Sequence, residues 1–239
     1  PAYLDEAAKS FSDCIAYEAA SKKQRYSKEA VEMLPYVAAD YVSMAEDLNF
    51  NKQDKAGAVK AYKSAYELRM SMGQMDTLTY SYMGYLYQDL KEYAMAEEVY
   101  KKLIEMDFKG ITWSGILTED GQRYPFPGKK TVDFYVQTER ASEPKRSESI
   151  NHEFYIQLLW VYNEQKDQER YDALMKAARA KFPSNDQLLK MELQSFLDKG
   201  DFDGALANLD EALVNDPKIA LYLYNAGVIN HQQKKNIEK

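Results

Sequence analysis

The 239-residue sequence contains only one cysteine and two histidines, and both scarcities limit its chemistry. A single cysteine, Cys14, cannot form a disulfide within the chain, and on an amphipathic helix we expect a buried, inert thiol. Neither His152 nor His231 has the spacing from a second ligand that a metal site requires, so we expect both to be exposed polar residues. The sequence therefore predicts no metal and no cofactor.

Long hydrophobic runs and an excess of basic residues are also missing. The longest apolar segments, such as LLWVY at 158–162, are far shorter than the roughly 20 residues of a membrane-spanning helix. Lysine and arginine number 31 against 38 acidic residues, which gives a net charge of −7. The basic residues form no patch that could neutralise a run of phosphates. We therefore expect neither a transmembrane segment nor nucleic-acid binding.

The common catalytic motifs are absent as well. The chain contains no glycine-rich phosphate loop, nucleophile elbow or H-E-x-x-H zinc motif. Its carboxylates, as in AEE at 96–98 and LDEAL at 209–213, have the spacing of solvated helix surfaces. The segment SGILTEDG combines a serine with two acids, but no histidine is near in the sequence, and a plain turn accounts for it. We expect no enzyme activity.

What the sequence does contain is hydrophobic and aromatic residues, 45% and 13% of the chain, ample for a core. Around MGYLYQDLKEYAMAEEVYKKLI, apolar residues recur every three or four positions, which predicts antiparallel helices at 77–90 and 94–107. A glycine inside a helix costs about 1 kcal/mol relative to alanine. Gly84 therefore predicts a close crossing, with Ala96 facing it and Tyr87 and Tyr100 filling the space on either side.

The same pattern returns along the chain. Tyr87, Tyr162, Phe196 and Asn230 occupy equivalent places, separated by 75, 34 and 34 residues. A helix-turn-helix period of 34 residues is the signature of tetratricopeptide repeats, or TPRs. The chain resembles that family in these residues: Tyr80, Met83, Gly84, Tyr87, Ala96 and Tyr100 in one unit; Tyr155, Leu158, Tyr162, Ala178 and Pro183 in a second; Phe196, Ala205, Leu209, Ala212 and Pro217 in a third; Tyr41, Met44, Ala45, Leu48, Ala58, Tyr62 and Ala65 in a fourth.

The resemblance implies an all-α, α-α superhelical TPR solenoid with a small β-hairpin insert. We predict a single array in these parts: a helical N-terminal part at 1–37, repeats near 38–72, 77–110, 152–185 and 186–219, a partial repeat at 220–239, and the insert at 111–151. The turn of the 38–72 unit is about one residue longer than the others. Large residues replace the small ones at Leu159, Leu193 and Tyr171, which predicts more open packing there.

The insert at 111–151 is not helical at its start. ITWSGIL and QRYPFP flank the turn TEDG and predict a β-hairpin with its turn at Asp120 and Gly121. KKTVDFYVQTER predicts a short helix, and ASEPKRSES a polar linker. We expect the hairpin to seal the break in the helical stack, although its edge could instead accept a partner strand.

Inserts of this kind are similar to those of bacterial envelope proteins made of several TPRs. That resemblance implies a periplasmic or envelope protein whose signal peptide has been removed, rather than a cytoplasmic one, and the start at Pro1 without methionine permits this. At the other end, the helix at 221–230 lacks a partner and would expose an apolar face. We expect the natural chain to continue beyond Lys239 or another molecule to cover this end, self-association included.

In the TPR family, the first helices line a concave face that binds ligands. Carried over by position, that face would contain Ser81, Tyr85, Gln88, Ile156, Trp160, Asn163, Lys190, Gln194 and Tyr224. The aromatic residues among them favour an extended peptide with apolar side chains, although many of the tyrosines could simply wedge between helices. Lysine and asparagine are too few there for the clamp that binds acidic chaperone tails.

We therefore predict a non-catalytic scaffold that binds a protein or extended peptide on its concave face. The alternative is a glycan-binding or small-nutrient-binding accessory protein of the bacterial envelope.

Overall fold

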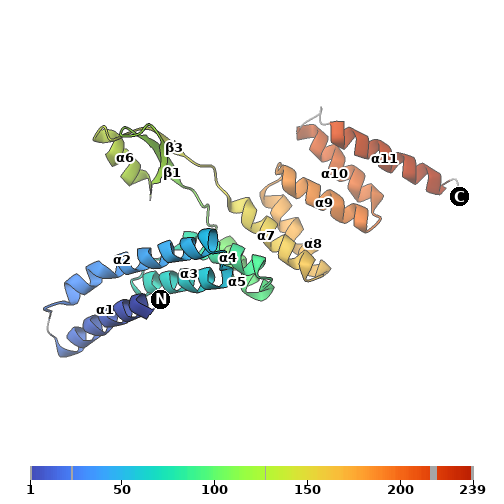
Figure 1. The fold of residues 1–239 in the computed structure, drawn as a ribbon. Helices are drawn as coiled ribbons and strands as arrows, with labels where there is room; N and C mark the ends of the chain where they lie inside the picture. The colour runs from blue at the N-terminus through green and yellow to red at the C-terminus, as the bar shows by residue number, and fades with distance from the viewer. Residues whose placement is uncertain (1, 23, 127, 216–219, 238–239) are drawn as a thin grey trace. The chain divides into compact units, whose positions relative to one another are not determined.

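The computed structural model describes residues 2–22, 24–126, 128–215 and 220–237 of the chain. Pro217, expected to close a repeat, lies outside them. The chain divides into two compact units, Pro1–Asn151 and His152–Lys239, which we describe separately. Both are built mainly from antiparallel helix pairs, and the first also carries a small sheet (Figure 1). The fold is thus an all-α solenoid with a β insert. No helix of the described ranges is both long and apolar enough to span a bilayer.

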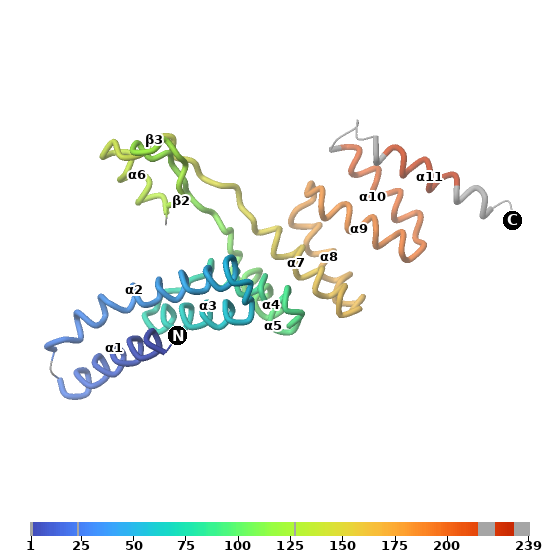
Figure 2. The backbone as a smooth tube through the Cα atoms, viewed as in Figure 1, coloured from blue at the N-terminus to red at the C-terminus, as the bar shows by residue number. Residues whose placement is uncertain are grey.

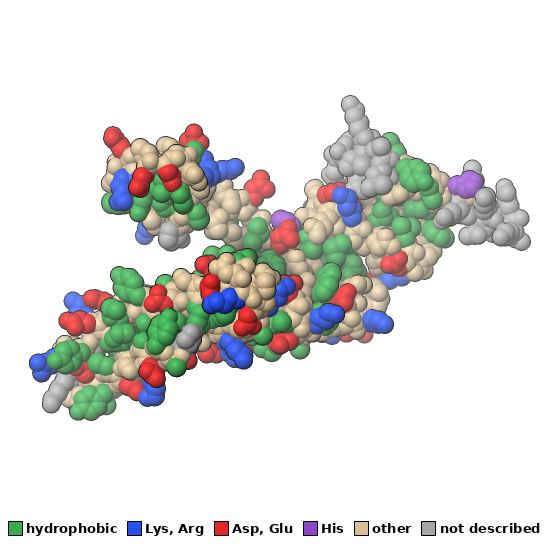
Figure 3. Space-filling model, viewed as in Figure 1, with side chains coloured by type: hydrophobic (Ala, Val, Ile, Leu, Met, Phe, Trp, Pro, Cys, Tyr) green, Lys and Arg blue, Asp and Glu red, His purple; other side chains and the backbone are tan. Residues whose placement is uncertain are grey.

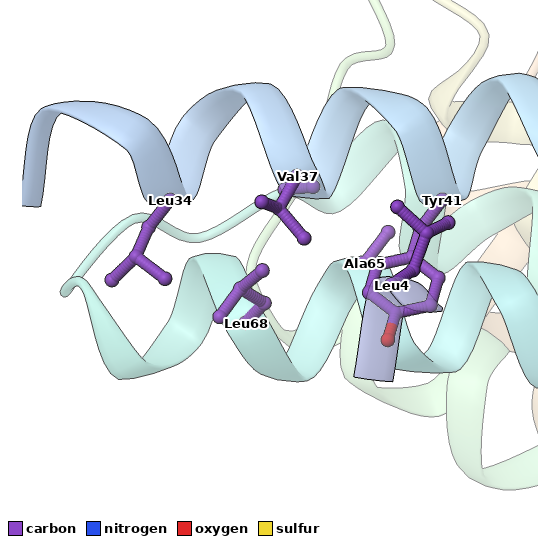
Figure 4. Packing of buried hydrophobic residues seen from close by; sticks show 7 residues of the cluster. Leu4, Leu34, Val37, Tyr41, Ala65 and Leu68 are labelled. Carbon is purple, nitrogen blue, oxygen red and sulfur yellow. The ribbon is translucent and has the colours of Figure 1, made fainter. Parts of the chain in front are cut away.

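The first unit begins with helices α1 (Ala2–Ser21), α2 (Ser27–Glu46) and α3 (Lys55–Ser71). Their shared core consists of apolar side chains that point toward one another from all three helices, as Figure 4 shows for Leu4, Leu34, Val37, Tyr41, Ala65 and Leu68. The Tyr41 hydroxyl donates to Asp5 Oδ1 at 2.5 Å, which ties α2 to α1. Hydrophobic side chains are also visible on the outside of this helical layer in Figure 3, among acidic and basic ones.

The turn between α1 and α2 is held by a single carboxylate, that of Glu18. It accepts hydrogen bonds from the backbone N–H groups of Arg25 at 2.9 Å, Tyr26 at 3.0 Å and Ser27 at 2.8 Å. Burial opposes ionisation of this carboxyl, but the three hydrogen bonds outweigh it and lower the pKa of Glu18. Glu18 therefore supplies the cap that the start of α2 otherwise lacks.

Helix α2 crosses the boundary that we expected between residues 1–37 and 38–72. It runs unbroken through Pro35 and continues past Tyr41. Proline removes one helical hydrogen bond, but Leu34 and Val37 on either side of it are buried in the core, and this packing holds the helix together. The longer turn of the 38–72 unit takes the form of a π-helical turn, η1 (Asp47–Asn51), in which one extra residue is accommodated.

Helices α4 (Thr77–Asp89) and α5 (Tyr93–Glu105) form the expected antiparallel pair. The reason for Gly84 differs in detail from the expectation. A Cβ atom at Gly84 would lie 2.9 Å from the Tyr100 ring and 2.9 Å from Val99, whereas Ala96 is not among its nearest neighbours. The glycine makes room for the ring of Tyr100, which is fully buried. The distance between α4 and α5 at this crossing is therefore set by the ring of Tyr100, which fills the space that a side chain at position 84 would take.

The turns within the helix pairs share one geometry. Each turn contains one residue whose backbone is in the left-handed region, such as Lys91 at φ 61° or Lys166 at φ 56°. The next backbone N–H then bonds back to the carbonyl oxygen of the residue five positions earlier, as Glu92 does to Tyr87, Asp167 to Tyr162 and Asp201 to Phe196. In the first pair, Asp54 bonds to Leu48, six positions earlier, because of the extra residue in η1. Asn230, in contrast, is followed by no such turn up to Ile237, within one described helix.

The insert contains a three-stranded antiparallel sheet rather than a hairpin alone. Its strands are β1 (Trp113–Leu117), β2 (Arg123–Phe126) and β3 (Ala141–Arg146), in the order β2-β1-β3. The predicted helix forms as α6 (Lys129–Gln137), whose fully buried Val132 packs against the sheet. The prediction of a polar linker was therefore wrong for residues 141–146, where backbone pairing with β1 outweighs the polar composition.

The insert leaves and re-enters the helical part at one point (Figure 2). The Ile150 N–H donates to the Lys109 carbonyl oxygen at 2.9 Å, and the Asn151 side-chain amide donates to the Phe108 carbonyl oxygen at 2.8 Å. Gly110 adopts φ 58°, and a Cβ there would lie 2.3 Å from Ile150. Only glycine permits this conformation and contact together. The two connections are therefore fastened side by side.

The second unit consists of helices alone in the residues described. They are α7 (Asn151–Glu164), α8 (Gln168–Lys181), α9 (Asp186–Asp198), α10 (Phe202–Asn215) and α11 (Ala220–Ile237). Leu189, Leu193, Ala205, Leu209 and Ile229 are buried in its C-terminal core.

The second unit also buries a cation. Arg179 is 8% exposed and donates to Glu192 at 2.9 Å and to Glu211 at 2.6 Å. Asn208 donates to the same Glu192 carboxylate at 2.8 Å. Ion pairing with Glu211 and Glu192 raises the pKa of Arg179 against the effect of burial. The guanidinium therefore joins α8, α9 and α10.

Candidate functional site

The second unit contains a groove between α7, α8 and α9 with a volume of about 340 Å³. We refer to it as the α7–α9 groove, and its lining consists of Trp160, Asn163, Gln168, Tyr171, Met191, Gln194, Ser195, Asp198 and Lys199. Three of these residues, Trp160, Asn163 and Gln194, are among the ligand contacts predicted from the sequence. The structure thus brings together a subset of that set, from α7 and α9.

The groove lies where a large residue replaces the expected small one. Tyr171, near the start of α8, lines it and is 8% exposed. Its hydroxyl donates to the Met191 carbonyl oxygen at 3.5 Å, a long hydrogen bond. Burial first, and then the nearby carboxylates Asp172, Glu192 and Asp198, raise the pKa of this hydroxyl to about 12, so that it stays neutral. The Tyr171 ring keeps the neighbouring helices apart, and the groove occupies the space that a closer helix crossing would have filled.

Polar side chains around this aromatic lining form ion pairs and hydrogen bonds with one another. The Lys199 ammonium lies 2.7 Å from both oxygens of Asp172, and the Gln168 amide donates to Asp172 at 2.8 Å. The Gln194 amide donates to Asp198 at 2.7 Å. Burial would raise the pKa of Asp172, but the bonds from Lys199 and Gln168 lower it instead. The rim is therefore charged and hydrogen-bonded at neutral pH.

The groove lining combines apolar side chains with side-chain amides. Trp160, 38% exposed, forms an apolar wall together with Met191, and amide groups of Asn163 and Gln194 lie beside them. Aromatic and thioether groups bury apolar side chains, while side-chain amides bond to a peptide backbone. None of the residues that line this groove is a histidine or cysteine.

Three further predicted contacts in the second unit lie outside the groove. Lys190 is exposed and pairs with Asp186 at 2.5 Å, one helical turn away on α9. Tyr224 on α11 is 70% exposed. Ile156 is 4% exposed, and it does not line the groove. Its helix position places it one turn before Trp160, but its side chain is covered.

In the first unit, the predicted contacts Ser81, Tyr85 and Gln88 serve packing. Ser81 is 1% exposed, and its hydroxyl donates to the Leu78 carbonyl oxygen at 2.7 Å. The Tyr85 ring meets the Tyr100 ring edge to face, with centroids 5.9 Å apart. The Gln88 side-chain oxygen accepts from the Tyr100 hydroxyl at 2.8 Å. Tyr85 and Gln88 are half-buried and hold Tyr100 against Gly84.

Metal-binding chemistry finds no support in the part of the chain that the structure describes, which contains no cluster of three or more potential ligands. Cys14 is half-buried rather than buried and lines a groove between α1 and α2. His152 is half-buried too, 3.2 Å from Glu153 and edge to face with Phe182 at 6.0 Å, and only His231 is exposed as expected.

Sequence reasoning missed several residues of the groove, chiefly Tyr171, Met191 and Gln168. The one usable signal was Tyr171 itself, which replaces a small residue of the second helix and so predicted more open packing. Met191 and Gln168 carried no such mark, because neither occupies a position that the repeat pattern constrains.

Comparisons with known proteins agree on the fold. No protein-family model matches the chain, and no curated protein matches it. A crystal structure of the MamA protein is similar to it with a TM-score of 0.52 and 14% identity, over 84% of this chain and 85% of that one. A TPR protein from Bacteroides fragilis is similar over 84% of this chain and 73% of its own, with 16% identity and a TM-score of 0.45.

A third similar structure is PilF of Pseudomonas aeruginosa, with 10% identity and a TM-score of 0.47 over 97% of this chain and 92% of that one. Together with the helix pairs and their shared turns, the similarity to the MamA structure identifies the fold as that of the TPR solenoid.

Proposed function

We propose that this TPR-fold chain is a non-catalytic binding protein that holds an extended peptide segment of a partner protein in the α7–α9 groove. The observation that supports this most is the gathering of Trp160, Asn163 and Gln194 around one groove of about 340 Å³. An apolar side chain of the segment would contact the indole of Trp160 and the Met191 thioether. The amides of Asn163 and Gln194 would bond to its backbone.

The energetics of such a contact favour Trp160 as the dominant residue. Tryptophan is enriched among the few interface residues whose truncation costs 2 kcal/mol or more. Tyr171 in the same lining is already ordered by burial, so little of its conformational freedom is lost when a ligand binds. The ion pair between Lys199 and Asp172 gives the groove a fixed charged border that would set the direction of the segment.

The test is a peptide array followed by affinity measurement with the best-binding peptide. Trp160→Ala should weaken binding by roughly 30-fold, in line with a loss of about 2 kcal/mol. Tyr224→Ala removes an aromatic side chain that is more exposed but lies outside the groove, and should leave the affinity unchanged. Circular dichroism would verify that both variants keep their helices. Equal effects of the two substitutions would contradict the proposed site.

The glycan alternative predicts a different outcome of the same design. A panel of carbohydrates in a thermal-shift assay should then raise the melting temperature of the natural chain and not that of Trp160→Ala, while no peptide of the array binds. An aromatic ring beside amide groups is also compatible with a sugar face, which is why both panels are needed.

A further inference from the structure

A second groove, in the first unit, has a different chemistry. It lies between α3, α4 and α5 and has a volume of about 270 Å³. We call it the tyrosine groove, and it is lined by Lys63, Tyr66, Glu67, Tyr80, Met83, Tyr87, Met95, Glu98 and Val99. None of the ligand contacts predicted from the sequence belongs to it, and it is independent of the α7–α9 groove and its proposed function.

The walls of the tyrosine groove are aromatic faces in a fixed arrangement. Tyr66 of α3 and Tyr80 of α4 are stacked, with ring centroids 4.7 Å apart and planes at 23°. Burial first, and then Glu98, Tyr66 and Tyr87, raise the pKa of Tyr80 to about 12. The phenols therefore stay neutral, and their ring faces carry the negative quadrupole that attracts cations.

Two carboxylates lie at the same groove. Besides burial, the charges of Glu92, Glu98 and Glu67 raise the pKa of Tyr87, which shows that Glu67 and Glu98 act on the space next to this ring. Glu67 and Glu98 are both exposed, on α3 and α5. Lys63 also lines the groove, 3.8 Å from Glu67. Two carboxylates against one ammonium leave the groove negative, so its charge favours a cation.

The second unit shows what occupies the equivalent place there. The start of α3 is capped by Asp54 and that of α8 by Asp167, and each carboxylate accepts the N–H three residues on. Tyr66 and Arg179 both lie twelve residues after these caps. Likewise, Met83 and Glu192 both lie seven residues after the caps of α4 and α9, Asp76 and Asn185.

The equivalence matters because Arg179 and Glu192 form an ion pair at 2.9 Å. At this position the second unit therefore carries a guanidinium of its own, held by carboxylates of α9 and α10. The first unit has Tyr66 and Met83 at the corresponding positions, and the groove beside them is lined by the carboxylates of Glu67 and Glu98.

From the stacked rings and the two carboxylates, we propose that the tyrosine groove binds an arginine side chain of a partner protein. The planar guanidinium stacks on the Tyr66–Tyr80 pair, and its N–H groups donate to Glu67 and Glu98. Arginine suits the site better than lysine, because its guanidinium stacks on aromatic faces and presents several donors in one plane. The thioethers of Met83 and Met95 contact the aliphatic part of the side chain.

The experiment uses capped Gly-Arg-Gly and, as the uncharged control of the same shape, capped Gly-citrulline-Gly. With methionine methyl groups labelled for NMR, the arginine peptide should shift the signals of Met83 and Met95 saturably, and the citrulline peptide should not. A capped Gly-trimethyllysine-Gly peptide tests the choice of cation. Tighter binding of trimethyllysine than of arginine, or equal shifts with citrulline, would overturn the proposal.

Charge variants of the full chain sharpen the test. Glu98→Gln should weaken the arginine peptide about threefold or more, whereas Lys63→Gln should strengthen it by a similar factor. Glu105→Gln, an exposed acid of the same helix α5 outside the groove, is the matched control and should change nothing. If Glu98→Gln and Glu105→Gln have equal effects, the groove is not the binding site.

A double substitution supplies the cation internally. Tyr66→Arg combined with Met83→Glu copies the Arg179–Glu192 pair into the first unit and should abolish the methyl shifts of Met95. Circular dichroism and an unchanged NMR signal of Met44, which packs against the core of α1–α3, would establish that the variant is folded. Unaltered binding of the arginine peptide by this folded variant would contradict the proposal.

Discussion

The two units of the chain fill equivalent packing positions with opposite chemistry. In the first, Gly84 leaves room for the buried ring of Tyr100, and Tyr66 stacks on Tyr80. In the second, leucine replaces the glycine at Leu193, and Arg179, paired with Glu192, takes the place of Tyr66. The aspartate caps of α3 and α8 are the same in both, and so are the turns after Tyr87, Tyr162 and Phe196. The caps and turns at the helix ends therefore define the repeat, while the side chains packed between the helices can differ from one unit to the other.

The largest expected effect concerns the buried cation of the second unit. Arg179→Met should lower the free energy of unfolding by about 3 kcal/mol, because Glu192 then keeps a charge near the core with only Asn208 as donor. The double variant Arg179→Met with Glu192→Met should recover most of that loss, since no unpaired charge remains. Urea unfolding followed by the fluorescence of Trp160 measures both. A double variant no more stable than the single one would show that the pair matters for more than charge balance.

The next effect separates two helical glycines. Gly84→Ala should lower the free energy of unfolding by about 1–3 kcal/mol, because the added methyl group meets Tyr100 and Val99 at 2.9 Å. Gly227→Ala has nothing within 4 Å of the new atom and should stabilise α11 by up to about 1 kcal/mol through helix propensity. Thermal unfolding by circular dichroism compares them. The same sign of change in both would contradict the packing role of Gly84.

A smaller effect tests the aromatic stack of the first unit. Tyr66→Leu keeps an apolar side chain but removes the ring contact with Tyr80, and should lower the free energy of unfolding by about 1 kcal/mol. Tyr66→Phe retains the stack and should change it by less. Chemical unfolding of both variants gives the comparison. A loss in Tyr66→Phe as large as in Tyr66→Leu would assign the stability to the hydroxyl instead.

The smallest effect is a dependence on pH at the α1–α2 turn. Because the folded protein lowers the pKa of Glu18, its stabilising effect is complete above the ordinary pKa of a glutamate, about 4.3. It disappears as the pH falls through the lowered value. Glu18→Gln should therefore reduce the melting temperature at pH 7 and reduce it less at pH 3. A constant difference between the two proteins across this range would contradict the role of the charge.

Much of the helical fold followed from the sequence, because its signals are local. Residues spaced by three and four positions gave the pair at 77–90 and 94–107, against the observed Thr77–Asp89 and Tyr93–Glu105. The third strand of the insert was not predicted, since ASEPKR has neither alternating apolar residues nor β-branched ones. It lies at the edge of the sheet, where a proline such as Pro144 is tolerated.

The candidate site followed less well, for a geometric reason. One position along a helix turns a side chain by about 100°, so a pattern that identifies the ligand-facing side places individual residues poorly. Ser81 and Ile156 were expected on that side and are buried, while Trp160, Asn163 and Gln194 line a groove. Tyr171 contributes to the groove from a neighbouring helix, which no pattern within α7 or α9 could reveal.

The close contact between Gly110 and Ile150 brings the two ends of the insert together, so the insert could be replaced as one segment. Because the chain departs and returns through adjacent hydrogen-bonded residues, a short turn could close the gap between Lys109 and Ile150. Any foreign domain whose own ends are adjacent could be spliced in at the same place. The junction is thus an attachment point at which a label or a new binding domain can be carried while α1–α5 keep their own packing.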